Sequence, residues 1–212
     1  MALLGQAALA MWWDMAPAMR REFEHWHTHE HFPERLALPG FRRASRWADA
    51  AGGPGFFVMY ELAGHAALSS PEYLARLNDP TPWSRQLMPH HANMVRSQCV
   101  VRHSRGGGVA RHALTLRMAE RPDDELPALA DGLAGHPGIA GAHLLRNDAP
   151  KIAPTEEQRI RNNADAAADW VFVVCGYDAA ALEAVRDAEI AGPGAVAGLY
   201  TLQLSMVAGE PA

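Results

Sequence analysis

The chain has 212 residues, of which 49% are hydrophobic and 20% charged, a composition typical of a globular protein with a sizeable core. Its formal net charge is −5, and without a basic block this argues against nucleic acid as a partner. No run reaches the roughly 20 apolar residues that a membrane span requires. Two cysteines without a CxxC motif fit a reducing cytoplasm.

The first half of the sequence predicts elements in the order β-α-β-β-α-β. An apolar strand over residues 3–13 precedes an amphipathic helix over 15–37, which a Pro39-Gly40 turn follows. A Gly-rich hairpin lies at 52–55, and Ser70-Pro71 begins a second helix that ends at Leu77. The remaining strands of this half are predicted over residues 41–47, 56–60 and 94–102.

The same order recurs after a flexible joint of three glycines at 106–108. Strands are predicted over 109–118, 139–145, 170–175 and 197–207, and helices over 123–134 and 179–188. Residues 146–168 form a polar, charged insertion that we expect to be an exposed loop or short helix. The predicted fold class is α+β, in which two tandem ferredoxin-like units, 1–105 and 109–212, form a pseudo-dimeric α+β barrel. Packing their bare sheet faces together would enclose a cavity, where we expect the chemistry.

Four histidines on alternate positions mark the most informative segment, His25-Trp26-His27-Thr28-His29-Glu30-His31. An imidazole exchanges a proton near neutral pH and also binds metals. Helical periodicity places His27 and His31 on one flank, and His25 and His29 on a different face. We expect Pro33 to end or kink this helix, so that the helix dipole favours protonated His31.

Glu30 falls on the apolar stripe of this helix, four residues after Trp26. A desolvated carboxylate has a raised pKa and serves as an acid or base near neutral pH. The functional interpretation is an acid–base pair of Glu30 and His31, with His27 or Arg35 binding an anionic or carbonyl group.

Two other interpretations of the segment stay open. The helix is a solvent-facing, His-rich surface on which Glu30 pairs with an arginine, or histidines four residues apart chelate a metal. The two histidine pairs point apart, however, and the sequence shows no third ligand. We therefore assign no metal site.

A family resemblance rests on the residues from Phe23 through Arg43. Trp26, Glu30-His31-x-Pro33-Glu34-Arg35 and Leu38-Pro39-Gly40-Phe41 resemble the EthD-like proteins of the dimeric α+β-barrel superfamily, whose helix carries a His-x-Pro motif before a Pro-Gly turn. Residues 60–83 look like an uncharacterised bacterial branch of that group. The motif covers residues 12–102, and the second half lacks it.

The resemblance implies a β-lined pocket for a small, often aromatic molecule, and a pocket histidine that matches His31. Relatives include cofactor-free monooxygenases, lactone isomerases, polyketide cyclases and haem enzymes. Trp83 follows a rigid Thr-Pro turn, which suits either a lid over the pocket mouth or a structural staple. Arg96 is interpreted as a carboxylate partner or a substrate anchor, and only one of Tyr60 and Glu61 can face the pocket.

The sequence thus predicts a cytoplasmic acid–base enzyme acting on a small hydrophobic or aromatic metabolite, without a cofactor. It is an isomerase, dehydratase, cyclase or cofactor-free monooxygenase. The alternative is a non-catalytic protein that binds such a molecule or haem. A homodimer is compatible with either function. The candidate catalytic residues are Glu30, His31 and His27, and the candidate substrate-binding residues are Trp26, Arg35, Tyr60, Trp83 and Arg96.

Overall fold

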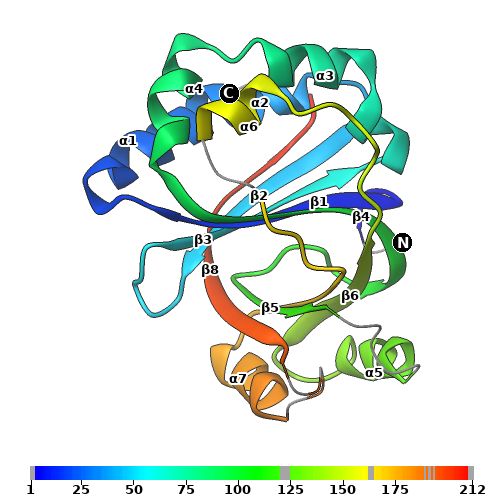
Figure 1. The fold of residues 1–212 in the computed structure, drawn as a ribbon. Coiled ribbons are helices and arrows are strands. Elements are labelled where there is room, and N and C mark those ends of the chain that lie inside the picture. The colour runs from blue at the N-terminus through cyan, green and yellow to red at the C-terminus, as the bar shows by residue number, and fades with distance from the viewer. Residues whose placement is uncertain are drawn as a thin grey trace.

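Eight antiparallel strands close into a barrel in the order β1-β3-β2-β8-β5-β7-β6-β4 (Figure 1). The computed structural model describes residues 3–119, 125–161, 165–188, 190, 192 and 194–209. The strands are β1 (Ala7–Met15), β2 (Phe41–Asp49), β3 (Gly55–Leu62), β4 (His91–Gly106), β5 (His112–Met118), β6 (Ile139–Asn147), β7 (Trp170–Gly176) and β8 (Val196–Val207). The barrel with its helices confirms the predicted α+β class.

Helices cover two opposite sides of the barrel (Figure 1). One side carries α1 (Arg20–Trp26), α2 (Phe32–Leu36), α3 (Pro71–Asn78), α4 (Pro82–Leu87) and α6 (Glu156–Arg161), and the other carries α5 (Leu126–Leu133) and α7 (Ala179–Asp187). The predicted start of α5 at Asp123 lies outside the described residues. In the part of the chain that is described, no helix has both the length and the apolar character to span a bilayer.

Large aromatic side chains fill the inside of the barrel. Side chains alternate between the two faces of a strand, so Trp12 points inward while Trp13 packs under the helices. Trp12 stacks on Phe57 with ring centroids 5.1 Å apart, and Phe57 stacks on Trp47 at 5.2 Å. These rings therefore fill the place between the sheet faces where we predicted a cavity. The cavity that holds the histidines lies on the outer face of the sheet, beneath the helices.

Both cysteines are buried in this interior, as expected for small apolar side chains. Cys99 and Cys175 are free thiols, and burial raises the pKa of each to about 12. Neither is a thiolate at neutral pH, so neither is a nucleophile.

One long helix carries the histidine segment, and its centre is wider than an α-helix. Residues His27–His31 form a π-helical turn between α1 and α2. Of the two outcomes predicted at Pro33, an end or a kink of the helix, the end is wrong, because the helix continues to Leu36. A proline ring clashes with the carbonyl four residues earlier in an α-helix, and the wider turn directly before Pro33 relieves that clash. Such π turns occur frequently at functional sites.

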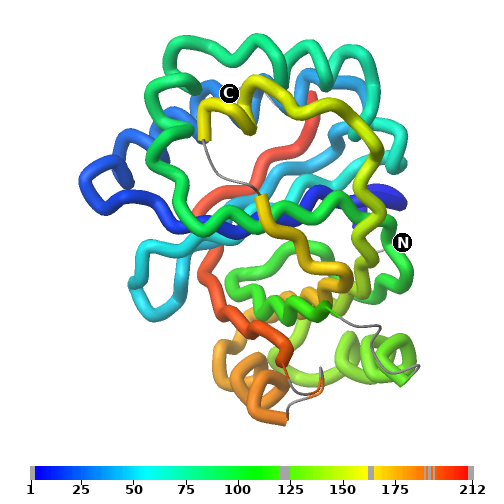
Figure 2. The backbone as a smooth tube through the Cα atoms, viewed as in Figure 1, coloured from blue at the N-terminus to red at the C-terminus, as the bar shows by residue number. Residues whose placement is uncertain are grey.

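The insertion between β6 and β7 crosses from the second half of the chain to the helices of the first half. Figure 2 shows this yellow segment running up beside the layer that contains α2 and α3. Two backbone hydrogen bonds anchor its return, from Arg96 N to Ala166 O at 2.8 Å and from Ala166 N to Met94 O at 3.0 Å. The segment contains the short helix α6, one of the two predicted alternatives, but it covers the outer face of the first-half sheet instead of lying exposed.

Candidate functional site

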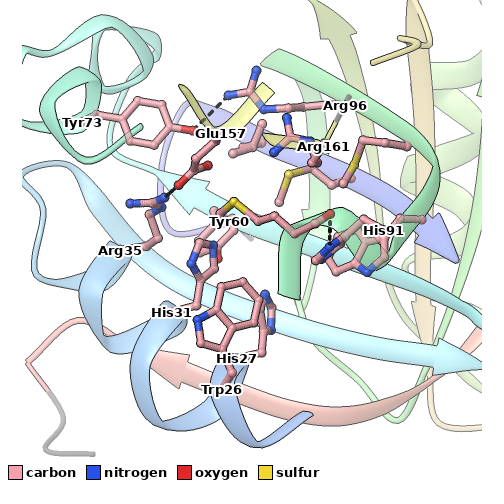
Figure 3. Close-up of a pocket in the computed structure, with 15 residues that line it drawn as sticks. Trp26, His27, His31, Arg35, Tyr60, Tyr73, His91, Arg96, Glu157 and Arg161 are labelled. Carbon is pink, nitrogen blue, oxygen red and sulfur yellow. Dashed lines mark hydrogen bonds and ion pairs between the residues drawn. The ribbon is translucent and has the colours of Figure 1, made fainter. Parts of the chain in front are cut away.

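A small cavity of about 50 Å³ lies between the outer face of β1, β3 and β4, the long helix and α6. Aromatic rings, methionines, imidazoles and arginines from both halves of the chain surround it (Figure 3). The lining residues are Leu9, Met11, Trp13, Trp26, His27, His31, Arg35, Tyr60, Tyr73, Met88, His91, Met94, Arg96, Glu157 and Arg161.

The helix presents His27 and His31 to this cavity together. Their rings stack with centroids 5.3 Å apart and an interplanar angle of 22°, and both side chains are buried. His25 and His29 are exposed and form a separate pair with centroids 4.8 Å apart. Both pairings agree with the helical periodicity, because residues four apart share a face.

Hydrogen bonds fix the tautomers of two cavity imidazoles. Arg46 Nη1 lies 3.3 Å from His27 Nδ1, and since an arginine only donates, His27 Nδ1 accepts and its proton is on Nε2. His91 Nδ1 lies 3.2 Å from the carbonyl oxygens of Leu87 and Met88. That nitrogen must donate, so His91 Nε2 keeps its lone pair. The site therefore holds one imidazole donor and one imidazole acceptor.

The three cavity imidazoles are neutral at neutral pH. Burial holds the pKa of His27 and of His31 well below the ordinary value, with further lowering by Arg46 and Arg35 respectively. Burial, with Arg161 nearby, lowers the pKa of His91 to about 4. The expectation of a protonated His31 is wrong, because the helix does not end there and the side chain is desolvated.

Several polar atoms around the cavity have no hydrogen-bond partner among the described residues. Besides Arg161 Nε, they are Trp13 Nε1, His31 Nδ1 and Tyr60 Oη. Tyr60 is 1% exposed, and burial raises the pKa of its hydroxyl, which keeps it protonated. A buried polar group without a partner is costly and needs an explanation. A ligand that accepts and donates hydrogen bonds would satisfy all three atoms.

Charged side chains form the side of the cavity nearest α6. The Arg35 guanidinium forms a buried ion pair with Glu157 (Figure 3). Arg161 Nη2 donates to Asp165 Oδ2 at 2.8 Å. The predicted exposure of the 146–168 insertion is wrong at Glu157, because α6 packs this side chain against Arg35.

Arg96 differs from these pairs because its partners are neutral. Its Nη2 donates to the Tyr73 hydroxyl at 2.9 Å and its Nη1 to Gln98 Oε1 at 2.9 Å. In the described ranges it has no carboxylate partner within ion-pair distance. It is a cation available to an anionic or carbonyl group of a ligand.

Two of the predicted site residues lie outside the cavity lining. The Glu30 carboxylate accepts hydrogen bonds from Trp26 Nε1 at 3.0 Å and Thr81 Oγ1 at 2.5 Å, which links the long helix to the start of α4. Trp83 Nε1 donates to Glu22 on the surface at 2.9 Å. The structure brings together the other six, which are Trp26, His27, His31, Arg35, Tyr60 and Arg96.

Sequence reasoning missed several cavity residues. Trp13 alternates with inward-facing Trp12 on β1, and strand periodicity contains that signal. Of the pair His90-His91, the structure buries His91 and exposes His90, a choice that depends on the turn before β4. Glu157 and Arg161 come from the insertion, where no local pattern marks them.

The closed barrel and its two helical layers can now be compared with known proteins. Over 99% of this chain and 97% of its own, the structure of an anthrone oxidase-like protein superposes with a TM-score of 0.66 at 13% identity. The chain has the dimeric α+β-barrel fold. A presumed monooxygenase from Fusobacterium nucleatum subsp. nucleatum matches with a TM-score of 0.61 and 8% identity, covering 97% of this chain and 96% of its own.

A third solved structure, of a presumed monooxygenase from Lactobacillus acidophilus NCFM, has a TM-score of 0.52 and 9% identity and covers 96% of this chain and 97% of its own. No family model matches the sequence, and no curated protein matches it significantly. At these identities the shared property is the fold.

Proposed function

We propose that this chain is an enzyme that removes a proton from a small aromatic molecule with an acidic O–H, or with an acidic C–H beside a carbonyl. The observation that carries the proposal is His91, a buried neutral imidazole whose Nδ1–H donates to backbone carbonyls 3.2 Å away. Such a bond orients the ring and leaves Nε2 as the basic atom. A neutral base in an aromatic cavity suits a neutral, aromatic acid.

The groups around His91 complement the anion that proton removal creates. His27 offers Nε2–H and Tyr60 its hydroxyl, and Arg96 supplies positive charge without a carboxylate partner in the described residues. Donors that are already oriented toward developing negative charge stabilise a transition state strongly in a site that excludes water. Base and anion-binding groups therefore face the same cavity.

Among the reactions that begin with such a proton removal, we propose cofactor-free oxidation as the one this chain catalyses. An enolisable CH₂ group loses one proton to His91, and the resulting carbanion or phenolate transfers electrons to O₂. A C–O bond forms, and the resulting peroxide takes back the proton from His91. The second C–H bond then breaks as the O–O bond is cleaved, which gives a C=O group and a hydroxide ion that combines with the second proton to make one water. The names of the structural neighbours, anthrone oxidase-like and monooxygenase, support this choice. Isomerisation, dehydration and cyclisation would use the same base.

The predicted residues take modified roles in this proposal. His27 and His31 are cavity imidazoles, and Trp26 is an aromatic wall 4.5 Å from the His31 ring. Glu30 positions Trp26 through its hydrogen bond. Trp83 helps to hold α1 through Glu22. His91 takes the role of base that the sequence suggested for Glu30.

Neither haem nor a metal ion enters this mechanism. The cavity of about 50 Å³ has room for roughly three to five water molecules, which does not fit a porphyrin. Among the residues that the structure places, no three His, Cys, Asp or Glu side chains gather closely enough to hold a metal. The proposed steps use protein side chains and O₂.

Three finer assignments are part of the same proposal. Membership of the EthD-like branch is supported by the match of fold, and a cytoplasmic location by the free cysteines. The division into tandem units, 1–105 and 109–212, is supported by the strand order. It is β4-β1-β3-β2 in the first set of strands and β8-β5-β7-β6 in the second.

Deuterium exchange without oxygen tests the base directly. Anthrone and 2-indanone are incubated anaerobically in D₂O with the wild-type chain, and NMR follows loss of the acidic C–H signal. His91→Asn keeps polarity but removes the basic nitrogen. It should slow exchange about 100- to 10,000-fold, the usual contribution of a general base. His25→Asn, an exposed change of the same type, is the matched control and should leave the rate unchanged.

The outcomes separate an enzyme from a binding protein. Enzyme-catalysed exchange that His91→Asn abolishes, followed by O₂ uptake in air, supports the proposal. Saturable quenching of tryptophan fluorescence without any exchange supports the non-catalytic alternative. Exchange that is equally fast in His91→Asn overturns the assignment of the base.

A further inference from the structure

A second, larger cavity adjoins the first. It is a partly open cleft of about 430 Å³ beneath the insertion, and Arg96 lines both cavities. One wall is apolar and comes from residues 149–154, and the polar floor includes Gln98 and Asp165. Arg96 thus lies where the inner cavity and this outer cleft meet.

The inner cavity and the outer cleft together offer the volume that a small-molecule substrate needs. Pockets for small molecules usually measure about 300–1,000 Å³, and the inner cavity is about 50 Å³. It has room for a reacting head group. The outer cleft of about 430 Å³ has room for the body of the molecule.

The polar floor of the cleft carries one free donor and one free acceptor. Gln98 Oε1 accepts from Arg96 Nη1 at 2.9 Å, which leaves Gln98 Nε2 without a partner among the described residues although Gln98 is only 5% exposed. Asp165 Oδ2 accepts from Arg161 Nη2 at 2.8 Å, and Asp165 Oδ1 is likewise unpartnered there. In each of these side chains, one polar atom makes a hydrogen bond within the protein and the second polar atom is unpartnered.

We propose that the outer cleft binds the body of an elongated substrate and recognises a neutral hydroxyl or carboxamide group on it. The oxygen of that group accepts from Gln98 Nε2, and its O–H or N–H donates to Asp165 Oδ1. The apolar wall packs against the connecting ring, and Arg96 contacts the substrate where it passes into the inner cavity. A carboxylate in the same place has no N–H or O–H to donate to Asp165 Oδ1, so it makes one hydrogen bond fewer than a carboxamide. This inference rests on the proposed function for the identity of the head group.

Calorimetric titration of the full chain with three naphthols tests the proposal. The probes are 2-naphthol, 6-hydroxy-2-naphthamide and 6-hydroxy-2-naphthoate, which share a head and differ in the arm. The amide should bind wild type about tenfold more tightly than 2-naphthol, because it gains two hydrogen bonds to buried groups. The naphthoate should bind less tightly than the amide, because it cannot donate to Asp165 Oδ1.

Gln98→Met keeps the length of the side chain and removes both the donor and the oxygen that accepts from Arg96. The ratio of amide affinity to 2-naphthol affinity should fall to about one, and circular dichroism shows that the variant is folded. Gln86→Met, an exposed change of the same type on α4, is the control and should keep the tighter binding of the amide. Asp165→Asn should remove the preference for amide over naphthoate.

The proposal is overturned if wild type does not prefer the amide, if Gln98→Met keeps that preference, or if none of the three probes binds. Its failure is distinct from failure of the proposed function. Amide-dependent binding without deuterium exchange would support the subsite and refute the proposed enzymatic function. Exchange without a preference for the amide would support the enzymatic function and refute the subsite.

Discussion

Replacing either of two tyrosines in the cavity lining with phenylalanine should change the stability of the fold, but in different directions. Tyr60 and Tyr73 are 1% and 2% exposed. The Tyr73 hydroxyl accepts from Arg96 Nη2 at 2.9 Å, whereas the Tyr60 hydroxyl has no partner in the described residues. Replacing each with phenylalanine removes one oxygen and leaves the ring packing in place.

The expected changes in the free energy of unfolding follow from the hydrogen bonds that each hydroxyl makes. Tyr73→Phe loses a bond to a charged group, so the free energy of unfolding should fall by about 1.5–3 kcal/mol. Tyr60→Phe removes a buried hydroxyl that gains nothing from the protein, so stability should stay equal or rise by up to about 1 kcal/mol. For a chain of this size 1 kcal/mol moves Tm by roughly 2–4 °C. Tyr60→Phe should also weaken binding of 2-naphthol, since the hydroxyl is proposed to contact the ligand.

Urea unfolding followed by circular dichroism measures both variants against wild type, with thermal unfolding as a second readout. The m-value should stay constant, so that midpoints report stability alone. If Tyr60→Phe loses as much stability as Tyr73→Phe, the Tyr60 hydroxyl is already satisfied within the folded chain. The Tyr60 hydroxyl would then need no ligand to complete its hydrogen bonding.

Two further predictions concern pH and Glu30. Burial holds the pKa of His91 at about 4 against an ordinary value of 6.5, so the unfolded chain binds more protons and stability should fall as pH drops from about 6.5 to about 4. The loss from His91 alone is roughly 3 kcal/mol, and urea unfolding of wild type and His91→Asn across that range should show a shallower decline in the variant. Glu30→Gln keeps an oxygen that accepts from Trp26 and Thr81, so deuterium exchange should stay within about threefold of wild type. A loss of 100-fold or more would return Glu30 to the role of acid or base.

The arrangement within the histidine helix was predictable because it depends on local geometry. Residues four apart share a helical face, which is sufficient to pair His27 with His31 and to separate them from His25 and His29. The barrel architecture was predictable for a similar reason, since the order of strands and helices is written in the alternation of apolar and turn residues. Predicting these features does not require knowing which other elements pack against them.

The position of Glu30 shows what periodicity leaves out. The stripe it shares with Trp26 is covered in part by the cavity and in part by α4, and sequence spacing does not distinguish the two covers. The carboxylate meets Thr81 at the start of α4. Periodicity identifies a buried face, and only the tertiary structure identifies what buries it.

The features that could not be predicted from the sequence depend on contacts between segments that are distant in the chain. Arg35 and Glu157 are 122 positions apart, and no local pattern connects them. The location of the cavity depended on which sheet face carries the larger side chains, and the Trp12, Phe57 and Trp47 rings fill the inner one. These features arise from packing between elements rather than from the elements themselves.

Nitrogen-15 NMR of the histidine rings tests the central claim most directly. At pH 7 the spectrum should show His91 neutral, with its proton on Nδ1, and His27 neutral, with its proton on Nε2. Addition of 2-naphthol should shift the ring signals of His27, His31 and His91 and leave those of exposed His25 and His29 unchanged. If His91 is protonated or carries its proton on Nε2, or if the ligand shifts His25 and His29 instead, the cavity beneath the long helix is not the working site.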